Sequence, residues 1–275
     1  MTVSINTNVG AMVALQNLNK TNMDLEQTQN RINTGFKVSS AKDNGAIYAI
    51  AQRMRSDVQA YGAVKNVLDR VSSTVDVGLA AGESVMDLLT QMKEKALAAA
   101  DASIDTNSRD SYNVDFVALR NQITRIVQNA TFNGVNMVNG TTVSMRALAN
   151  ATGTNLLTVL AENMTLGGGV VTVTAAGQIN TRTLASAMIA TINTSITNLG
   201  LALARMGTGS KALEMHTVFV GKLADALDAG VGNLVDADLA KDSARLQALQ
   251  TKQQLGVQAL SIANQAPQAI MSLFR

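Results

Sequence analysis

The sequence predicts a mainly α-helical protein, with long antiparallel coiled-coil helices, paired helices formed by the two termini, and a small β-hairpin insert. A seven-residue apolar repeat runs through both halves of the 275-residue chain, which indicates helices wound around one another. The single proline, Pro267, is compatible with long uninterrupted helices. Hydrophobic residues make up 47% of the chain but aromatic residues only 3%, and such a small-aliphatic core favours close helix packing over a thick β-sandwich.

The first segment, residues 1 to about 35, has the pattern of an amphipathic helix with one narrow apolar stripe among Asn, Gln and Thr. The stripe comprises Val9, Met12, Leu15, Leu18, Leu25 and Ile32. This helix has little to fold onto within its own segment. Asn33-Thr34-Gly35 ends it, and residues 37–43 form a polar turn with several possible helix caps.

The strongest pattern lies between about residues 44 and 100. Small or apolar residues occupy two core positions over six heptads, namely Tyr61, Leu68, Val75, Gly82, Leu89 and Ala96, and then Val64, Val71, Gly78, Val85, Met92 and Ala99. A helix of this length spans on the order of 80 to 90 Å, which is far more than a compact domain needs. Because each Gly costs roughly 1 kcal/mol of helix propensity relative to Ala, we expect a neighbouring helix to approach closely at Gly78 and Gly82.

A polar turn at residues 105–108 leads into a shorter helix that we expect to run antiparallel to the first. Its apolar positions are Tyr112, Phe116, Leu119, Ile123, Ile126 and Ala130. Between about residues 131 and 180, Gly and Asn separate three apolar or β-branched runs at 143–145, 156–160 and 170–174. These runs predict short hairpins.

From about residue 181 an apolar seam returns and continues towards the C-terminus. It comprises Ile189, Ile192, Ile196, Leu199, Leu203, Met206, Ser210, Leu213, Thr217, Val220, Ala224, Leu227, Val231 and Leu234. The register shifts near residues 235–238, and a new seam follows with Leu239, Leu246, Leu249, Leu260, Ala263, Ile270 and Phe274. Because a register shift marks a change of packing environment, we expect a terminal domain of residues 1–40 with 236–275. A rod-like helical domain of residues 41–235 would then include the β region at about 131–180.

The patterns that carry chemistry in other proteins are weak here. His216 is the only histidine, and the chain has no cysteine, which leaves no partners for a His-based metal site or a Ser–His system. Gly167–Gly169 lacks the Lys-Ser/Thr that completes a phosphate loop. Asp236, Asp238 and Asp242 do not fit an EF-hand. We therefore expect no enzyme and no catalytic, cofactor or metal site.

Charge and hydropathy exclude other partners. The net charge is +2 and the Lys and Arg residues are dispersed, which disfavours nucleic-acid binding. No stretch approaches the roughly 20 consecutive apolar residues of a membrane span. The first 20 residues show no basic leader before an apolar run, so we expect any export to proceed without a cleaved signal peptide. The lack of cysteine suits a chain that must stay free of cross-links during export.

Specific motifs at both ends resemble those of bacterial flagellins, in the order that the family has them. At the N-terminal end these are Ser4–Asn8, Arg31–Gly35, Val38–Asp43 and Ala49–Ala51. At the C-terminal end they are Val235–Ala240, Ile262–Gln268 and Ser272–Arg275. The resemblance covers roughly residues 1–140 and 185–275, and the middle is too short to hold large outer domains.

The resemblance implies a structural subunit that is exported and polymerises into the helical flagellar filament used for swimming. It implies terminal helices that pair into an inner-tube domain, and a location outside the cell in the flagellum. Further implied partners are other copies of the chain, the hook-associated junction and cap proteins, the flagellar type III export apparatus and a chaperone that binds the C-terminal segment.

We expect the terminal helices to become ordered only when neighbouring subunits bury their apolar residues. The expected subunit-interface residues are Val9, Val13, Leu18, Leu25, Ile32, Leu239, Leu246, Leu249, Leu260 and Ile270. Two alternatives stay open at this point. One is a hook–filament junction protein, which shares weaker similarity at its ends, and the other is a cytosolic helical signalling rod.

Overall fold

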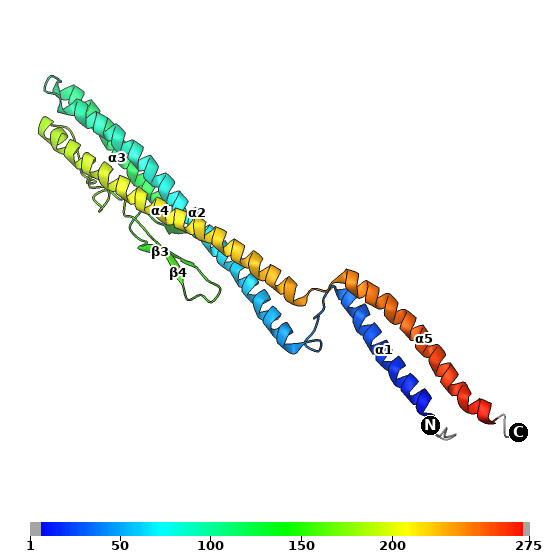
Figure 1. Cartoon of the computed structure of the whole chain (residues 1–275). Helices are drawn as coiled ribbons and strands as arrows, with labels where there is room; N and C mark the ends of the chain where they lie inside the picture. Colours follow the sequence, from blue (N-terminus) through cyan, green and yellow to red (C-terminus); the bar gives the residue numbers. More distant parts are fainter. Residues whose placement is uncertain (1–6, 272–275) are drawn as a thin grey trace. The chain divides into compact units, whose positions relative to one another are not determined.

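A computed structural model describes residues 7–271, with side chains described up to residue 265. The described part contains the helices α1 (Val9–Thr34), α2 (Gly45–Ala100), α3 (Thr106–Asn129), α4 (Arg182–Val235) and α5 (Leu239–Met271) (Figure 1). The short strands are β1 (Thr131–Phe132), β2 (Val135–Asn136), β3 (Ser144–Leu148) and β4 (Leu156–Leu160). The mainly α fold with a small β insert is therefore confirmed. The chain divides into two compact units, residues 57–225 and residues 1–56 with 226–275.

The core of the 57–225 unit is the predicted heptad seam of α2. Every seam position from Val64 to Ala99 is buried, and Tyr61 is half-buried. From α3 the core receives Phe116 and Ile123, and from α4 it receives side chains such as Leu199, all of them fully buried. This unit therefore has a continuous aliphatic core of its own.

The two seam glycines of α2 lie against side chains of α4. A Cβ on Gly78 would stand 2.7 Å from Met206 Cε, and a Cβ on Gly82 would stand 2.5 Å from Leu203 Cδ2. Side chains of a neighbouring helix therefore occupy the space beside both glycines, which explains why the seam accepts two residues with poor helix propensity. The expected close approach of the helix backbones stays a prediction.

The β insert contains two separate antiparallel hairpins. In the first, β1 and β2 are joined by Asn133 and Gly134, both with positive φ (49° and 79°), as a tight two-residue turn requires. In the second, β3 pairs with β4 from Ser144 opposite Leu160 to Leu148 opposite Leu156. Two of the three predicted runs thus take part in this hairpin.

The prediction of a strand at Val170–Thr174 is wrong. This segment has no strand partner, and it packs against α4 instead of pairing in a sheet. The Thr172 backbone N–H donates to Ser195 Oγ at 3.0 Å, while Val171 and Val173 are fully buried. Its β-branched side chains fill the helical core, so the apolar run reflects burial and not strand pairing.

The other unit contains the junction between α4 and α5. The expected register shift is a helix break, because α4 ends at Val235 and α5 begins at Leu239. The backbone N–H groups of Lys37 and Val38 donate to the Val235 carbonyl, and Ala237 N–H donates to the Gly35 carbonyl. These bonds satisfy backbone groups that the two interrupted helices leave without partners.

The expectation that no stretch is apolar enough for a membrane span needs a correction at α4. Among the described helices, α4 is long and apolar enough by length and composition alone, with a window of mean hydropathy 1.3. Only 22% of this window is buried, although Ile192, Leu199 and Met206 are fully buried in the helical core. One side of α4 is therefore part of the core, and the rest of the apolar window is on the surface of the unit.

Truncation of a seam residue in α2 should destabilise the 57–225 unit. Leu89 is fully buried, so Leu89→Ala is expected to lower the free energy of unfolding by about 2–5 kcal/mol. Leu97→Ala is the matched control on the same helix, because Leu97 is 52% exposed and its truncation should have little effect. Chemical denaturation followed by circular dichroism measures both, and equal losses would contradict the assigned seam.

Candidate assembly interface

The terminal helices α1 and α5 form an antiparallel pair. At one end Asn8 Nδ2 donates to the Ala263 carbonyl at 2.7 Å. Further along, Gln253 Nε2 donates to Asn22 Oδ1 at 2.8 Å. Residue numbers rise along α1 as they fall along α5, which fixes the direction of the pairing.

The facing sides of the two helices follow steps of three and four residues. On α1 the inner positions are Ala11, Ala14, Leu18, Thr21, Leu25, Thr28 and Ile32. On α5 they are Asp242, Leu246, Leu249, Gln253, Gly256, Leu260 and Ala263. We call these fourteen positions the inner seam. Its spacing is that of a two-stranded coiled coil.

The polar and small residues of the inner seam fit between the two helices, and the buried hydroxyl groups among them have hydrogen-bond partners. Thr21 and Thr28 are 3% exposed, and their hydroxyls donate to the carbonyls of Asn17 and Asp24, one turn earlier on the same helix. Gly256 leaves room for Leu18, since a Cβ there would lie 3.2 Å from Leu18 Cδ1. The helices can therefore pair closely, although the seam contains few large apolar side chains.

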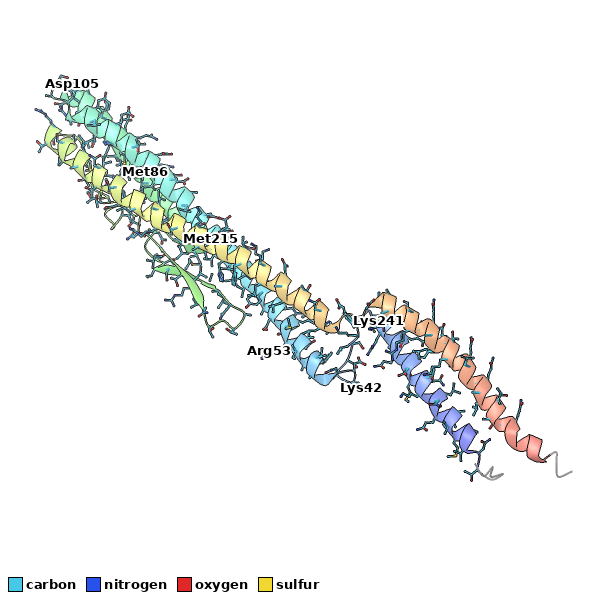
Figure 2. All side chains as sticks on the ribbon, in the orientation of Figure 1. Lys42, Arg53, Met86, Asp105, Met215 and Lys241 are labelled. Atoms are coloured by element: carbon cyan, nitrogen blue, oxygen red, sulfur yellow. The ribbon has the colours of Figure 1, made fainter. Side chains whose placement is uncertain are left out.

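The pair buries little of its own apolar surface. The only buried residues of α1 are Thr21 and Thr28, and those among the described side chains of α5 are Asp242 and Leu249. Side chains project outward from both helices (Figure 2), and the large apolar ones among them are each about half to two-thirds exposed. We call them the outer face, and they are Val9, Met12, Val13, Leu15, Met23, Leu239, Leu255, Val257 and Ile262.

The structure divides the expected interface residues into two groups. Leu18, Leu25, Ile32, Leu246, Leu249 and Leu260 lie in the inner seam of the same subunit. Val9, Val13 and Leu239 belong to the outer face, and the side chain of Ile270 lies outside the described residues. The expected place of Leu239 in the new seam is wrong, because Leu239 is 49% exposed and Asp242 takes the first buried position.

Sequence reasoning also placed Met12 and Leu15 in one stripe with Leu18, whereas the structure puts them on the outer face. A signal was present in the sequence, since Ala14, Thr21 and Thr28 form a second set of seven-residue steps, four residues before Leu18, Leu25 and Ile32. Because the side chains at this second heptad position are small or carry a hydroxyl group, an apolar pattern alone does not reveal it.

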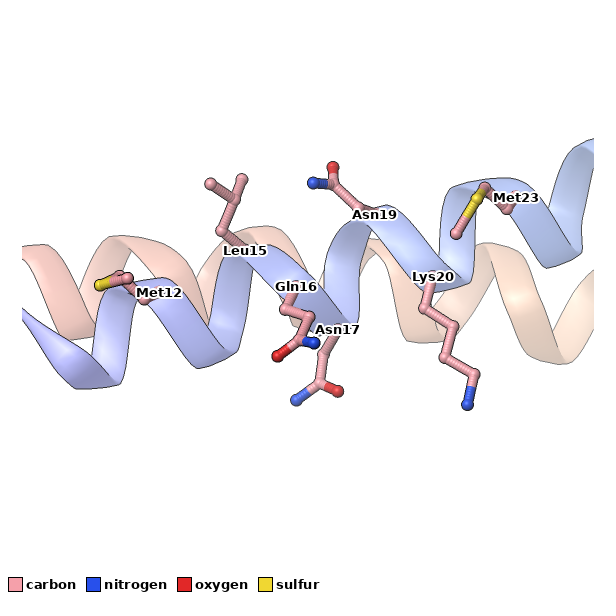
Figure 3. Close-up of a pocket in the computed structure, with 7 residues that line it drawn as sticks. All are labelled: Met12, Leu15, Gln16, Asn17, Asn19, Lys20 and Met23. Carbon is pink, nitrogen blue, oxygen red and sulfur yellow. The ribbon is translucent and has the colours of Figure 1, made fainter.

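An open groove of about 750 Å³ lies on the outer face of α1. Met12, Leu15 and Met23 line it together with the polar side chains of Gln16, Asn17, Asn19 and Lys20 (Figure 3). The groove combines apolar surface with amide groups. Such a mixed surface is typical of protein–protein contacts.

A compact loop connects α1 to α2. The Asp43 carboxylate accepts hydrogen bonds from the backbone N–H and the hydroxyl of both Ser39 and Ser40, at 2.9–3.3 Å. These donors, led by the Ser40 backbone N–H, lower the pKa of Asp43 below its ordinary value of 3.8. The ionised carboxylate therefore holds the loop in shape at neutral pH.

The residues that sequence analysis set aside have structural roles. His216 Nε2 lies 2.7 Å from the Ala149 carbonyl oxygen, and its ring contacts Phe219 at 5.8 Å between centroids. Gly167 has a positive φ of 76° in a turn closed by its N–H bond to the Val173 carbonyl. Within the described residues no group of three or more His, Cys, Asp or Glu side chains is placed to hold a metal ion.

Comparison with known proteins decides the family. The bacterial flagellin N-terminal helical region matches residues 5–143, and the bacterial flagellin C-terminal helical region matches residues 189–274. The chain belongs to the bacterial flagellins. It is 56% identical to flagellin FljM of Caulobacter vibrioides over 99% of this chain and 98% of that protein. It is 36% identical to a flagellin of Brucella melitensis over 99% of both chains.

A solved structure of Bacillus cereus flagellin aligns with 66% of this chain and 94% of its own, at 20% identity and a TM-score of 0.42, so the sequence matches alone decide the family. This flagellin is a structural subunit of the bacterial flagellar filament, and its location outside the cell follows from the family. Nothing in the comparisons favours the junction protein or the signalling rod.

Acid should loosen the loop between α1 and α2. Because the pKa of Asp43 is lower in the folded protein, its stabilising effect is complete above 3.8 and is lost as the pH falls through the folded-state value. Asp43→Asn should remove the effect at neutral pH, so the amides of Ser39 and Ser40 should exchange hydrogen faster at pH 7. Asp228→Asn on α4 is the control, and slow exchange in both variants would contradict the role of Asp43.

Proposed function

We propose that the subunit assembles through its paired terminal helices, and that neighbouring copies bury the outer face during polymerisation. The supporting observation is that α1 and α5 bury few large apolar side chains between them, while the outer face exposes many of them to solvent. Met12 is 62% exposed and Ile262 is 69% exposed, whereas α1 buries only two threonines. An apolar face of this kind favours a partner that removes it from water.

The two groups of residues have different parts in this proposal. Inner-seam residues such as Leu18 and Leu260 pair the two ends of one chain, and outer-face residues such as Val9 and Leu255 contact the next copies. Complete burial of one large aliphatic side chain contributes about 1.5–3 kcal/mol. Burial of several such side chains per subunit offsets the entropy that the terminal helices lose on becoming ordered.

We propose the functional division at the two helix breaks, with residues 1–40 and 236–275 as the inner-tube domain and residues 41–235 as the rod. The breaks support it, because α1 ends at Thr34, α2 begins at Gly45, and α4 ends at Val235. The compact units are divided at other positions, after residues 56 and 225, so the small core of Val38, Ala51, Val231 and Val235 falls in the same unit as the terminal helices.

The remaining partners are also proposals. We propose contacts with hook-associated junction and cap proteins, export through the flagellar type III apparatus without a cleaved signal peptide, and a chaperone that binds the C-terminal segment. We further propose that the subunit has no enzymatic role and needs no cofactor, nucleic acid or membrane. Family membership supports these points, and the lack of cysteine suits passage of an unfolded chain.

Two substitutions on α5 should separate the inner seam from the outer face. Leu260→Asp places a charge in the half-buried seam, so it should both unpair α1 from α5 and block polymerisation. Leu255→Asp changes a side chain that is 59% exposed, so it should leave the pair intact in the subunit yet still block polymerisation. Electron microscopy after addition of ammonium sulfate measures filaments, and hydrogen exchange of α1 amides measures pairing.

Leu255→Met is the conservative control and should assemble like the wild type, because it keeps the volume and apolar character of the side chain. Normal filaments from Leu255→Asp would overturn the proposed role of the outer face. Blocked assembly in Leu255→Met would show that the site tolerates no change at all, which is inconsistent with a simple apolar contact.

A further inference from the structure

We propose that Met12 and Met23 form an oxidation site at which hydroperoxides convert the thioethers to sulfoxides and thereby block assembly of the subunit. The inference deepens the proposed function, since it requires that the outer face of α1 becomes buried in the filament. It assigns to the oxidation of these two methionines an effect on assembly that oxidation of Met215, which is equally exposed on α4, does not have.

The first step is the difference in exposure among the methionines. Met12 is 62% exposed and Met23 is 64% exposed. In contrast, Met92, Met164 and Met206 are fully buried in the 57–225 unit. Because oxidation of methionine follows the access of the reagent to sulfur, α1 should react much faster than the helical core.

The second step is the common position of the two side chains. Eleven residues correspond to about three helical turns, so Met12 and Met23 project within roughly 20° of each other from α1. Both line the same groove, with Leu15 between them along the helix (Figure 3). A single patch of the assembly surface therefore contains two oxidisable sulfur atoms.

The reaction is simple and balanced. The sulfur lone pair attacks the outer oxygen of the hydroperoxide, the O–O bond breaks, and the proton on the attacked oxygen passes to the departing oxygen, which leaves a neutral sulfoxide. The departing group is water when the reagent is hydrogen peroxide and an alcohol when it is an organic hydroperoxide. Sulfur is oxidised by two electrons and the peroxide is reduced by two, so no further reactant is needed.

Methionine sulfoxide is unfavourable in a buried contact between subunits. A sulfoxide oxygen is a strong hydrogen-bond acceptor, whereas a thioether is a weak one. In the free subunit water solvates this oxygen, but a neighbouring copy on the groove would remove that water. Burying one unpaired acceptor for each modified residue should raise the critical concentration for polymerisation by roughly tenfold or more.

Treatment of the full-length subunit with hydrogen peroxide tests the proposal. Peptide mass spectrometry should find one added oxygen on Met12 and on Met23, and none on Met164 or Met206. The treated protein should polymerise poorly in ammonium sulfate, and methionine sulfoxide reductase should restore assembly without any mutation. Unchanged assembly of protein that is fully oxidised at both residues would overturn the proposal.

Matched variants locate the effect. The double variant Met12→Leu/Met23→Leu keeps the apolar volume and should assemble equally well before and after peroxide. Met215→Leu is the control, because Met215 is 64% exposed but lies on α4 (Figure 2), and this variant should stay sensitive. If peroxide no longer blocks assembly of Met215→Leu, or still blocks assembly of the double variant, the assignment of the effect to α1 is overturned.

A further variant separates this inference from the proposed function. Met12→Asp/Met23→Asp adds charge to the groove and should block assembly without any peroxide. Blocked assembly in this variant, combined with peroxide-resistant assembly of the wild type, would overturn the oxidation site alone. Normal filaments from the Asp variant would overturn the assembly role of the α1 outer face, and the oxidation site with it.

Discussion

Two helices alone cannot enclose a hydrophobic core, and the terminal part of this flagellin depends on that constraint. When α1 and α5 pair, each presents one narrow side to the other and leaves the rest of its circumference to solvent. The inner seam uses Ala, Thr and Gly at many positions, so the helices come close together while burying little apolar area. Most of the large apolar side chains of the pair stay outside it.

In the 57–225 unit more than two helices surround the apolar side chains, so a core can be enclosed. There α3 and α4 pack against the long heptad seam of α2, and the loop segment around Val171 adds further covering. Phe116, Leu68 and Leu199 are fully buried, so this unit encloses a core within one subunit. The chain thus contains one unit with an aliphatic core of its own and a terminal helix pair whose exposed apolar side chains, in our proposal, other copies cover.

The heptad helices were predictable from the sequence because their core positions contain mainly Val, Leu, Ile and Met over many turns. The packing of a neighbouring helix against Gly78 and Gly82 followed from the helix-propensity cost of glycine, and the helix break near residue 236 followed from the shift of register. These features are local or strictly periodic, and such features are readable without a structure.

The inner side of α1 was not correctly predictable from apolar residues alone. Thr21 and Thr28 are buried because their hydroxyls bond within the helix, whereas Met12 and Leu15 are exposed, and hydropathy ranks these residues in the opposite order. Leu239 was misplaced for the same reason, since Asp242 occupies the buried position. The run at 170–174 was misassigned because burial against helices and pairing in a sheet favour the same β-branched residues.

Hydrogen–deuterium exchange of the free subunit and of the filament, compared peptide by peptide, tests the central claim most directly. We predict that the amides of α1 and α5 exchange faster than those of the α2 seam in the free subunit and become much more strongly protected in the filament, while those of the α2 seam are slow in both. Amides of α1 and α5 that are as slow as the α2 seam in the free subunit, or that gain no protection in the filament, would contradict assembly by burial of the terminal helices.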